Sequence, residues 1–295
     1  MTVALDMPGA SAAPRGAGLF SPLGMVRHLW SLRDMIRQFT GREIAERTQG
    51  TALGWVWLMI TPLVRLSIYA LVFGELLGLR FGDRGGEYAF FLFCGLIVYG
   101  VFSDAATKCS GVITSRPRFV KKLVFPTEIL PVTVLGAGVV VALLELSLLI
   151  VGRVVLFQDV SPLFWMVPVA VIPMLMMALG LGWVLASLNV FLEDTREIAR
   201  LIIAQFLFFL TPIIYPASKA AELAEGGSMW IVRAAGWFIQ HQPMTVCVEA
   251  ARDVLLRGVM PNWIALGWVW LLGFVMMQVG FAFFMKSKGA LADVL

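Results

Sequence analysis

The sequence predicts an all-α membrane protein that crosses the bilayer several times. Of its 295 residues, 59% are hydrophobic and only 14% are charged, and the mean hydropathy is +0.86. A soluble domain of this length needs a polar surface, which so few charged residues do not supply. The apolar residues also form long blocks, unlike the short alternating runs of a sandwich or an outer-membrane barrel. We therefore expect lipid to surround most of the chain.

Residues 1–20 are rich in Ala, Gly and Pro and lack the continuous apolar core of a secretory signal. We expect them to form a disordered cytoplasmic segment. Residues 21–50 differ, because apolar side chains recur there at steps of four and three, which predicts an amphipathic helix at the cytoplasmic membrane interface. The apolar stripe is Met25, Leu29, Leu32, Ile36 and Phe39, and the polar face includes Arg27, Asp34, Arg37 and Gln38. Lipid headgroups or a partner protein would cover the polar face, and a solvated helix packed on the protein's own loops is the alternative.

A membrane-spanning helix needs about 20 mostly apolar residues. Six segments of the chain meet this requirement, and they predict one transmembrane domain over residues 51–289, followed by a tail at 290–295. The predicted spans are 53–76, 88–107, 127–151, 163–189, 198–215 and 263–285.

The stretch 216–261 is semi-apolar and contains two apolar pieces, Met229–Ile239 and Met244–Leu256, each too short to span. Gln240–Pro243 separates them with four residues that are costly at the centre of one long helix. We therefore expect a re-entrant helical hairpin between the fifth and sixth spans.

Lysine and arginine residues predict the orientation. With both termini in the cytoplasm, 15 of the 23 cations fall on cytoplasmic segments and 7 on outer segments, with Arg65 alone inside a span. This distribution satisfies the positive-inside rule. A seventh span would place Lys286 and Lys288 outside and break the pattern.

The sequence predicts neither an enzyme nor a metal protein. The three cysteines are widely spaced, and His28 and His241 have no metal-ligand spacing to other ligating residues. No nucleophile and base are arranged for catalysis. The chain also lacks the Gly-rich phosphate loop followed by Lys and Ser or Thr, so any ATP hydrolysis requires another chain.

Three groups of motifs, taken in order, resemble the membrane subunits of ABC-2 type polysaccharide exporters, particularly those for O-antigen and teichoic acid. The similarity covers about residues 20 to 285. The first group is GREIAERTQG from Gly41, LGWVW from Leu53, Pro62 and YALVFG from Tyr69. The second is FCGL from Phe93 and VKKLVFPTEILP from Val120. The third is LNVFLEDTRE from Leu188, FFLTPIIYP from Phe208, QPMT from Gln242 and RDVLL from Arg252.

The resemblance implies a homodimer of this chain that docks two copies of a separate ATPase subunit, which would hold ATP and Mg. It also implies an undecaprenyl-diphosphate-linked polysaccharide as cargo, membrane lipids as neighbours, no nucleic acid and a location in the bacterial inner membrane. One position departs from the family. Leu192-Glu193 stands where the family commonly has Phe-Arg, so a role for that arginine does not carry over.

The resemblance and the basic residues together predict where the ATPase docks. The internal loop Gly111–Phe125 is the most basic one, and its cations can pair with acidic groups of a partner or with the cargo diphosphate. Ordinary positive-inside charges are the alternative. The docking candidates, including two on the amphipathic helix, are Arg37, Arg42, Arg116, Arg118, Lys121 and Lys122.

Aromatic residues on three predicted spans are candidates for lining a channel, because sugar rings stack on aromatic faces. An interfacial belt and helix packing are the alternatives. Arg65 joins the candidates as an ionisable residue at membrane depth, and Glu145 lies roughly 9 Å from it in depth. The candidates are Trp55, Trp57, Arg65, Tyr69, Tyr99, Phe102 and Tyr215.

The predicted function is thus the permease of an ABC exporter for a lipid-linked polysaccharide of the O-antigen type. A capsular polysaccharide exporter is the nearest alternative. An ion-coupled secondary transporter fits less well, because it requires several buried carboxylates. A glycan-modifying membrane enzyme lacks its catalytic groups.

Overall fold

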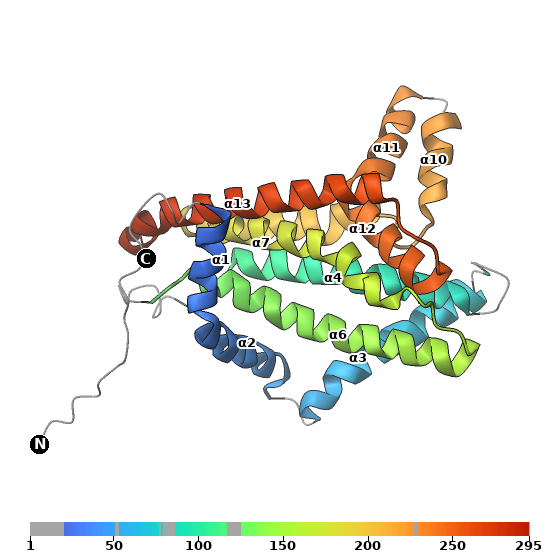
Figure 1. Cartoon of the computed structure of the whole chain (residues 1–295), viewed down its shortest axis with the longest axis horizontal. Helices are drawn as coiled ribbons and strands as arrows, with labels where there is room; N and C mark the ends of the chain where they lie inside the picture. Colours follow the sequence, from blue (N-terminus) through green and yellow to red (C-terminus); the bar gives the residue numbers. More distant parts are fainter. Residues whose placement is uncertain are drawn as a thin grey trace, which may run out of the picture.

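A computed structural model describes residues 21–50, 53–76, 78, 86–116, 125–226 and 229–294. These residues contain helices and no strand (Figure 1). Long helices run side by side along the longest axis, and the beginning of the first helix and the end of the last lie at the same end of the molecule. The predicted disordered segment 1–20 lies outside the described residues.

The predicted interface helix is two helices, α1 (Pro22–Ser31) and α2 (Arg33–Thr48), with a break at Leu32. Beside the break, the Ser31 hydroxyl donates a hydrogen bond to the His28 carbonyl, which is the local side-chain bonding that competes with a continuous helix. The predicted apolar stripe is the covered side. Met25 is buried and the stripe's other members are half-buried, whereas the four named polar residues are exposed.

Five helices are long and apolar enough to cross a membrane. They correspond to predicted spans one, two, three, four and six, and their ends differ from the predicted ones by a few residues. The first consists of Gly54–Val56, α3 (Trp57–Tyr69) and a π-helical turn, Ala70–Leu76. The others are α4 (Glu87–Ser110), α6 (Ile129–Phe157), α7 (Val167–Phe191, after a short turn Phe164–Met166) and α13 (Trp263–Val294).

The fifth predicted span is a shorter, irregular helical run. It comprises α8 (Thr195–Ala199), the π-helical segment Arg200–Phe206, here called η5, and α9 (Leu207–Leu210). The run ends at Thr211, whose backbone is extended with ψ 133°. A residue that precedes proline is pushed out of the helical region, and Pro212 therefore explains the end of this run.

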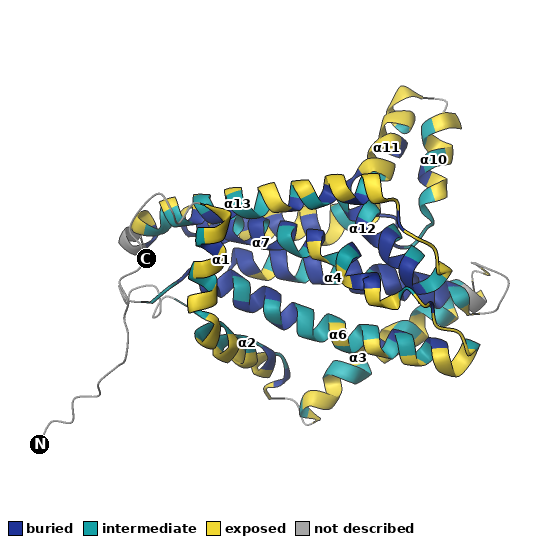
Figure 2. Cartoon of the chain, viewed as in Figure 1, coloured by how far each residue is buried: buried dark blue, intermediate teal, exposed yellow. Residues whose placement is uncertain are grey.

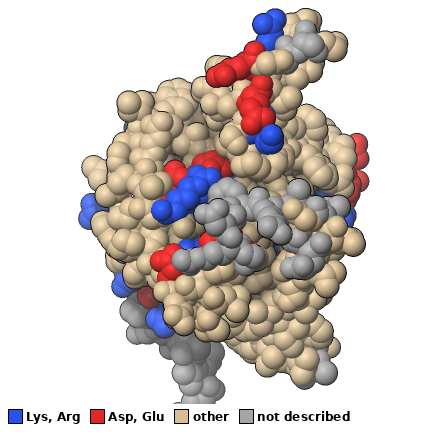
Figure 3. Space-filling model, turned by 90° about the vertical axis from the view of Figure 1, so that its right-hand side faces the viewer, with Lys and Arg blue, Asp and Glu red and all other residues tan. Residues whose placement is uncertain are grey.

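Three helices follow in the stretch that separates the fifth and sixth predicted spans. They are α10 (Ala217–Gly226), α11 (Trp230–His241) and α12 (Pro243–Arg252), which continues into the π-helical turn Asp253–Arg257. The sequence predicted α11, α12 and the break between them, but not α10. Figure 1 shows α10 and α11 projecting together from the bundle, while α12 packs against α4 and α7. Figure 3 faces this end, where most surface side chains are uncharged and the charged ones gather on the projection and near the middle.

The core lies around α4 and α7. Within an apolar stretch of 18 residues in each helix, 78% of the residues are buried in α4 and 56% in α7. In the helix containing α3 only 6% are buried (Figure 2). α3 therefore lies on the outside of the single chain, where lipid or another chain covers it.

Helices α7 and α13 pack through glycines. A Cβ atom added to Gly280 would lie 2.1 Å from the Gly180 carbonyl oxygen, and one added to Gly273 would lie 2.5 Å from the Pro173 oxygen. Only glycine allows the two backbones to approach so closely, as is typical of small-residue contacts between membrane helices.

Candidate functional site

The side chains of the docking candidates on α2 are exposed. Arg37 and Arg42 are both exposed, and Arg42 lies 3.8 Å from Glu46 one turn further on. An exposed ion pair of this kind contributes little to stability. Both guanidinium groups are therefore available to a partner at this end of the molecule.

Arg116 differs from these two arginines, because it forms ion pairs within the chain. Its Nη2 atom lies 2.6 Å from the Glu43 carboxylate and 3.0 Å from that of Glu46, and only 20% of its side chain is exposed. A second pair, Arg47 with Asp104 at 2.9 Å, joins α2 to α4. These pairs hold the polar side of α2 against the rest of the protein. The remaining docking candidates, Arg118, Lys121 and Lys122, lie outside the described residues.

Glu128 is a buried carboxylate that the sequence did not single out. It precedes α6, is 2% exposed, and accepts contacts from His28 Nε2 at 2.8 Å and Lys288 Nζ at 2.6 Å. Its backbone carbonyl accepts a hydrogen bond from the Trp183 indole at 3.0 Å. Burial acts to raise the pKa of Glu128, but the hydrogen bond from His28 and the charge of Lys288 outweigh it, so the pKa is lowered. Glu128 thus ties α1, α6, α7 and α13 together.

The channel candidates fall into exposed and buried groups. Trp55, Trp57 and Arg65 are exposed on the first spanning helix, and Tyr69 is half-buried with its ring 5.9 Å from that of Phe73. Exposure leaves the first three side chains free to face lipid, a channel or a second chain.

Tyr99 and Phe102 are buried inside the single chain. The Tyr99 hydroxyl donates a hydrogen bond to the Ile203 carbonyl in η5, and its ring lies 5.8 Å from that of Phe208. These contacts fix the irregular fifth segment to α4. Tyr215 is half-buried and donates to the Phe209 carbonyl at 3.0 Å. The channel-lining role of these residues stays a prediction.

The two charges at membrane depth do not meet. Within the described part of the chain, Arg65 and Glu145 form no ion pair, although α3 packs against α6. This leaves Arg65 on an exposed helix face and Glu145 half-buried.

Arg252 is the most deeply buried of the described cations, whereas the sequence placed it among the seven cations on outer segments and at the start of the RDVLL motif. Its side chain is fully buried, and its guanidinium lies 3.5 Å from the ring centre of Phe91. It donates hydrogen bonds to main-chain oxygens of α4 and of the segment after α9. Its Nη1 atom also pairs with Glu249 at 2.7 Å. The carbonyl acceptors are those of Phe91 at 3.2 Å, Pro212 at 2.6 Å and Ile213 at 2.8 Å.

Arg252 therefore supplies the donors that the non-helical backbone after α9 needs. Carbonyl groups released where a helix breaks must find other partners when water is excluded. A Cβ atom on Gly95 would lie 2.6 Å from Arg252 Nη2, so the glycine on α4 provides the space for this side chain.

Two cavities differ in chemistry. An apolar groove of about 480 Å³ lies between α4, α6 and α7. A polar cavity of about 430 Å³ lies at the α2 end of the bundle and includes Arg196 and Arg200 in its wall. The first is lined by apolar side chains, whereas the second has charged side chains of both signs in its wall.

Known proteins share this sequence pattern. The ABC-2 type transporter family matches residues 35–256. An O-antigen export system permease protein RfbA from Klebsiella pneumoniae is 24% identical over 92% of this chain and 99% of its own length. The protein of the same name from Myxococcus xanthus is 28% identical over 67% of this chain and 74% of its own. The polysialic acid transport protein KpsM of Escherichia coli is 20% identical over 85% of this chain and 92% of its own.

The family match covers most of the chain, from the first turn of α2 to the turn after α12, and therefore includes the ion pairs of α2, Glu128 and Arg252. The five long apolar helices give the chain the multi-pass membrane architecture that a transporter requires. The protein belongs to the ABC-2 type transporter family.

Proposed function

We propose that this chain is the permease subunit of an ATP-binding-cassette exporter that moves a lipid-linked polysaccharide of the O-antigen type across the inner membrane. The observation that carries the proposal is the match to the Klebsiella O-antigen export permease, which extends over 92% of this chain and 99% of that protein. The similarity therefore extends over nearly all of both proteins.

The ATPase is a separate subunit in this proposal, and ATP and Mg bind to it. Two features support docking at the α2 end: the exposed arginines Arg37 and Arg42, and the ion pairs that hold α2 rigidly on the bundle. A rigid surface helix can transmit movement of an attached ATPase to α4 and α6.

The proposed assembly is a homodimer with two ATPase copies. Apolar side chains on α3 and η5 support it, because the single chain leaves them largely exposed. They include Leu63, Val64, Ile68, Leu201, Ile202 and Phe206.

The proposed topology has six crossings and cytoplasmic ends. His28 and Lys288 contact the same carboxylate, which puts α1 and the end of α13 on one side. Five crossings would separate them, which supports a sixth crossing by the run Thr195–Leu210, continued at its outer end by the non-helical residues up to Tyr215. On this topology α11 and α12 form the re-entrant hairpin, and α1 and α2 lie at the cytoplasmic interface.

Gene replacement tests the proposal. A Gram-negative host that lacks its O-antigen permease receives this chain with its ATPase, and surface polysaccharide is measured with an antibody. Surface polymer is expected only when both subunits are present and the phosphate-loop lysine of the ATPase is intact. Export without the ATPase would instead favour ion-coupled transport.

The KpsM similarity supports one second candidate, export of capsular polysaccharide. The same chain, placed in a capsule-permease deletion host, distinguishes the two. Restoration of capsule without restoration of O-antigen would replace the first proposal with the second.

A further inference from the structure

The apolar groove between α4, α6 and α7 reaches the surface of the chain. Its floor includes Cys94, Ile97 and Val98, which are buried residues of α4, and α6 and α7 form its two walls. Leu143 on one wall is 59% exposed, and Ile172 on the other is 38% exposed. Because these helices are long and apolar enough to cross a membrane, lipid has access to this groove of about 480 Å³.

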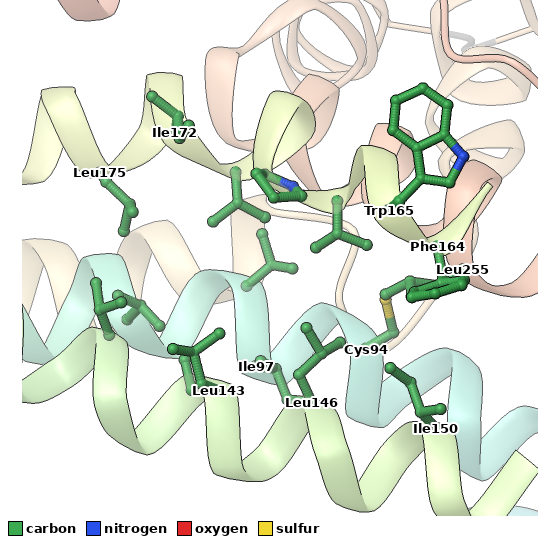
Figure 4. Close-up of a pocket in the computed structure, with 17 residues that line it drawn as sticks. Cys94, Ile97, Leu143, Leu146, Ile150, Phe164, Trp165, Ile172, Leu175 and Leu255 are labelled. Carbon is green, nitrogen blue, oxygen red and sulfur yellow. The ribbon is translucent and has the colours of Figure 1, made fainter.

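The chemistry of the groove favours a hydrocarbon ligand. Apart from the Cys94 thiol, the described residues that line it are aliphatic or aromatic. Figure 4 shows the side chains of Leu143 and Leu146 on α6 and of Leu175 on α7 in the space between the two helices. A polar group placed there would give up its hydrogen bonds to water without gaining others. A hydrocarbon chain has no such bonds to lose.

The groove has the length of one membrane leaflet. Along α6 it extends from Val139 to Ile150, and along the opposite wall from Phe164 to Leu175. Each wall is therefore about 16 Å long at a helical rise of about 1.5 Å per residue. One leaflet contributes about 15 Å to a hydrocarbon core of about 30 Å. The length of the groove thus matches that of one acyl chain of a bilayer phospholipid.

The groove lies in the outer leaflet on the proposed topology. α6 begins beside Glu128, which binds His28 at the cytoplasmic end, so the later part of α6 and the beginning of α7 lie toward the outside. Trp165 is 63% exposed at that end of the groove, and its ring is directed away from α6 in Figure 4. Tryptophan is enriched at the level of the lipid headgroups. An acyl chain would therefore enter beside Trp165 and extend toward the middle of the membrane.

Two other apolar ligands fit the groove less well. The apolar side chains that support the proposed dimer lie on α3 and η5, and those named above do not line the groove. A second copy that covers α3 and η5 therefore does not have to cover the groove. The long isoprenoid chain of the proposed carrier would extend well beyond a groove that has the length of a single leaflet.

We propose that the groove between α6 and α7 binds an acyl chain of a phospholipid of the outer leaflet. The inference goes beyond the proposed function, because this lipid is neither the cargo nor its carrier but stays with the folded subunit. Both α6 and α7 pack against α4, and the acyl chain would contact all three helices at once. Because the groove contacts hydrocarbon alone, the headgroup should contribute little to binding.

Native mass spectrometry of the delipidated full-length chain in detergent tests the site. The probes are palmitoyl-oleoyl phosphatidylcholine, palmitoyl-oleoyl phosphatidylglycerol and dihexanoyl phosphatidylcholine, and Kd is obtained from the bound fraction. The two long-chain lipids are expected to bind with similar Kd values. The dihexanoyl lipid should bind at least about tenfold more weakly, because each methylene group lost from the contact costs about fourfold in affinity. A Kd that follows the headgroup and not the chain length would overturn the proposal.

Matched tryptophan variants assign the binding to the groove. L143W and I172W each add a larger ring from an exposed position on one wall, so both should fold. Each ring should displace about two methylene groups of the lipid and weaken phosphatidylcholine binding by about tenfold. The control L271W alters a residue of α13 that is 55% exposed and does not line the groove, and it should bind like the parent. Equal Kd values for L143W and L271W, at similar melting temperatures, would overturn the site.

Two further measurements test the alternative ligands. The three native cysteines are buried, so oxidation of L143C in membranes reports on contact between copies at the groove. A disulfide-linked dimer would show that a second copy covers the groove, and displacement of phosphatidylcholine by an equal concentration of undecaprenyl phosphate would assign it to the carrier. Either result would overturn the proposal, and neither is expected. These assays involve no export, so failure of the site and failure of the proposed function are separate results.

Discussion

Arg252 Nη1 lies 2.6 Å from the carbonyl oxygen of Pro212, although 40 residues separate the two along the chain. The contact joins α12 to the point where the fifth segment stops being helical. Because the same guanidinium also binds carbonyls of Phe91 and Ile213, one side chain fixes the C-terminal end of α9 relative to α4.

Replacing Arg252 with Gln should destabilise the protein severely. The amide cannot reach all three carbonyls, and buried groups left without partners cost about 3–5 kcal/mol of unfolding free energy. Thermal unfolding in detergent measures the loss. The control is R257Q, whose pairs with Glu249 and Asp253 are partly exposed and contribute about 1 kcal/mol or less. Equal melting temperatures for the two variants would contradict the assigned role.

Gly280→Ala should disrupt the packing of α7 on α13. The new Cβ would meet the Gly180 carbonyl at 2.1 Å, so the helices must separate, at a cost of about 1–3 kcal/mol or more. Folded yield on size-exclusion chromatography and the melting temperature report the effect. Gly267→Ala is the matched control on the same helix, because nothing lies within 4 Å of its added Cβ. A wild-type melting temperature for both variants would refute the close approach.

Acid should weaken the contacts of Glu128. Its pKa in the folded protein is lowered from 4.5, because the bond from His28 and the charge of Lys288 outweigh the effect of burial. A lowered pKa stabilises the folded state above the unfolded value, and this stabilisation is lost as pH falls below about 4.5 through the folded pKa. Melting temperatures measured from pH 7 to pH 3 should show the loss.

The variants of this experiment separate Glu128 from other carboxylates. E128Q should be less stable than the parent at pH 7 and should depend less on pH in the acid range. E193Q alters an exposed carboxylate and should follow the parent at every pH. Matching curves for E128Q and the parent would show that Glu128 does not titrate as stated.

Reversing the charges of Arg37 and Arg42 should release the ATPase. Both side chains are exposed, so R37E/R42E is expected to fold normally, while like charges across the interface reduce co-purification of the ATPase by about tenfold. Pull-down from solubilised membranes provides the measurement. R233E alters an exposed arginine on α11, at the other end of the bundle, and should leave the complex intact. Full retention of the ATPase in R37E/R42E would place the docking surface elsewhere.

The sequence predicted the long helices that hydropathy identifies. Long apolar runs are visible in any window of suitable length, and α4, α6, α7 and α13 lie close to their predicted positions. The stripe from Met25 to Phe39 likewise identified the covered side of α1 and α2, because helical periodicity is a local property.

The sequence did not predict features that depend on distant contacts. In the sequence, Arg252 cannot be told from an ordinary interfacial cation. Its acceptors include the main-chain carbonyls of Phe91 and Pro212, and every residue type has such a carbonyl. The contacts of Glu128 were not predicted for a similar reason, because His28 and Lys288 are 100 and 160 residues away from it in the sequence. The break at Leu32 is also absent from the periodic pattern, which continues across it.

The shared carboxylate of Glu128 has a consequence for biogenesis. His28 is synthesised before Glu128, but Lys288 lies near the end of α13, 160 residues after Glu128. During translation the carboxylate therefore has only one of its two cationic partners, and α1 stays less firmly attached than in the finished protein. The attachment of α1 is therefore complete only when α13 has been inserted.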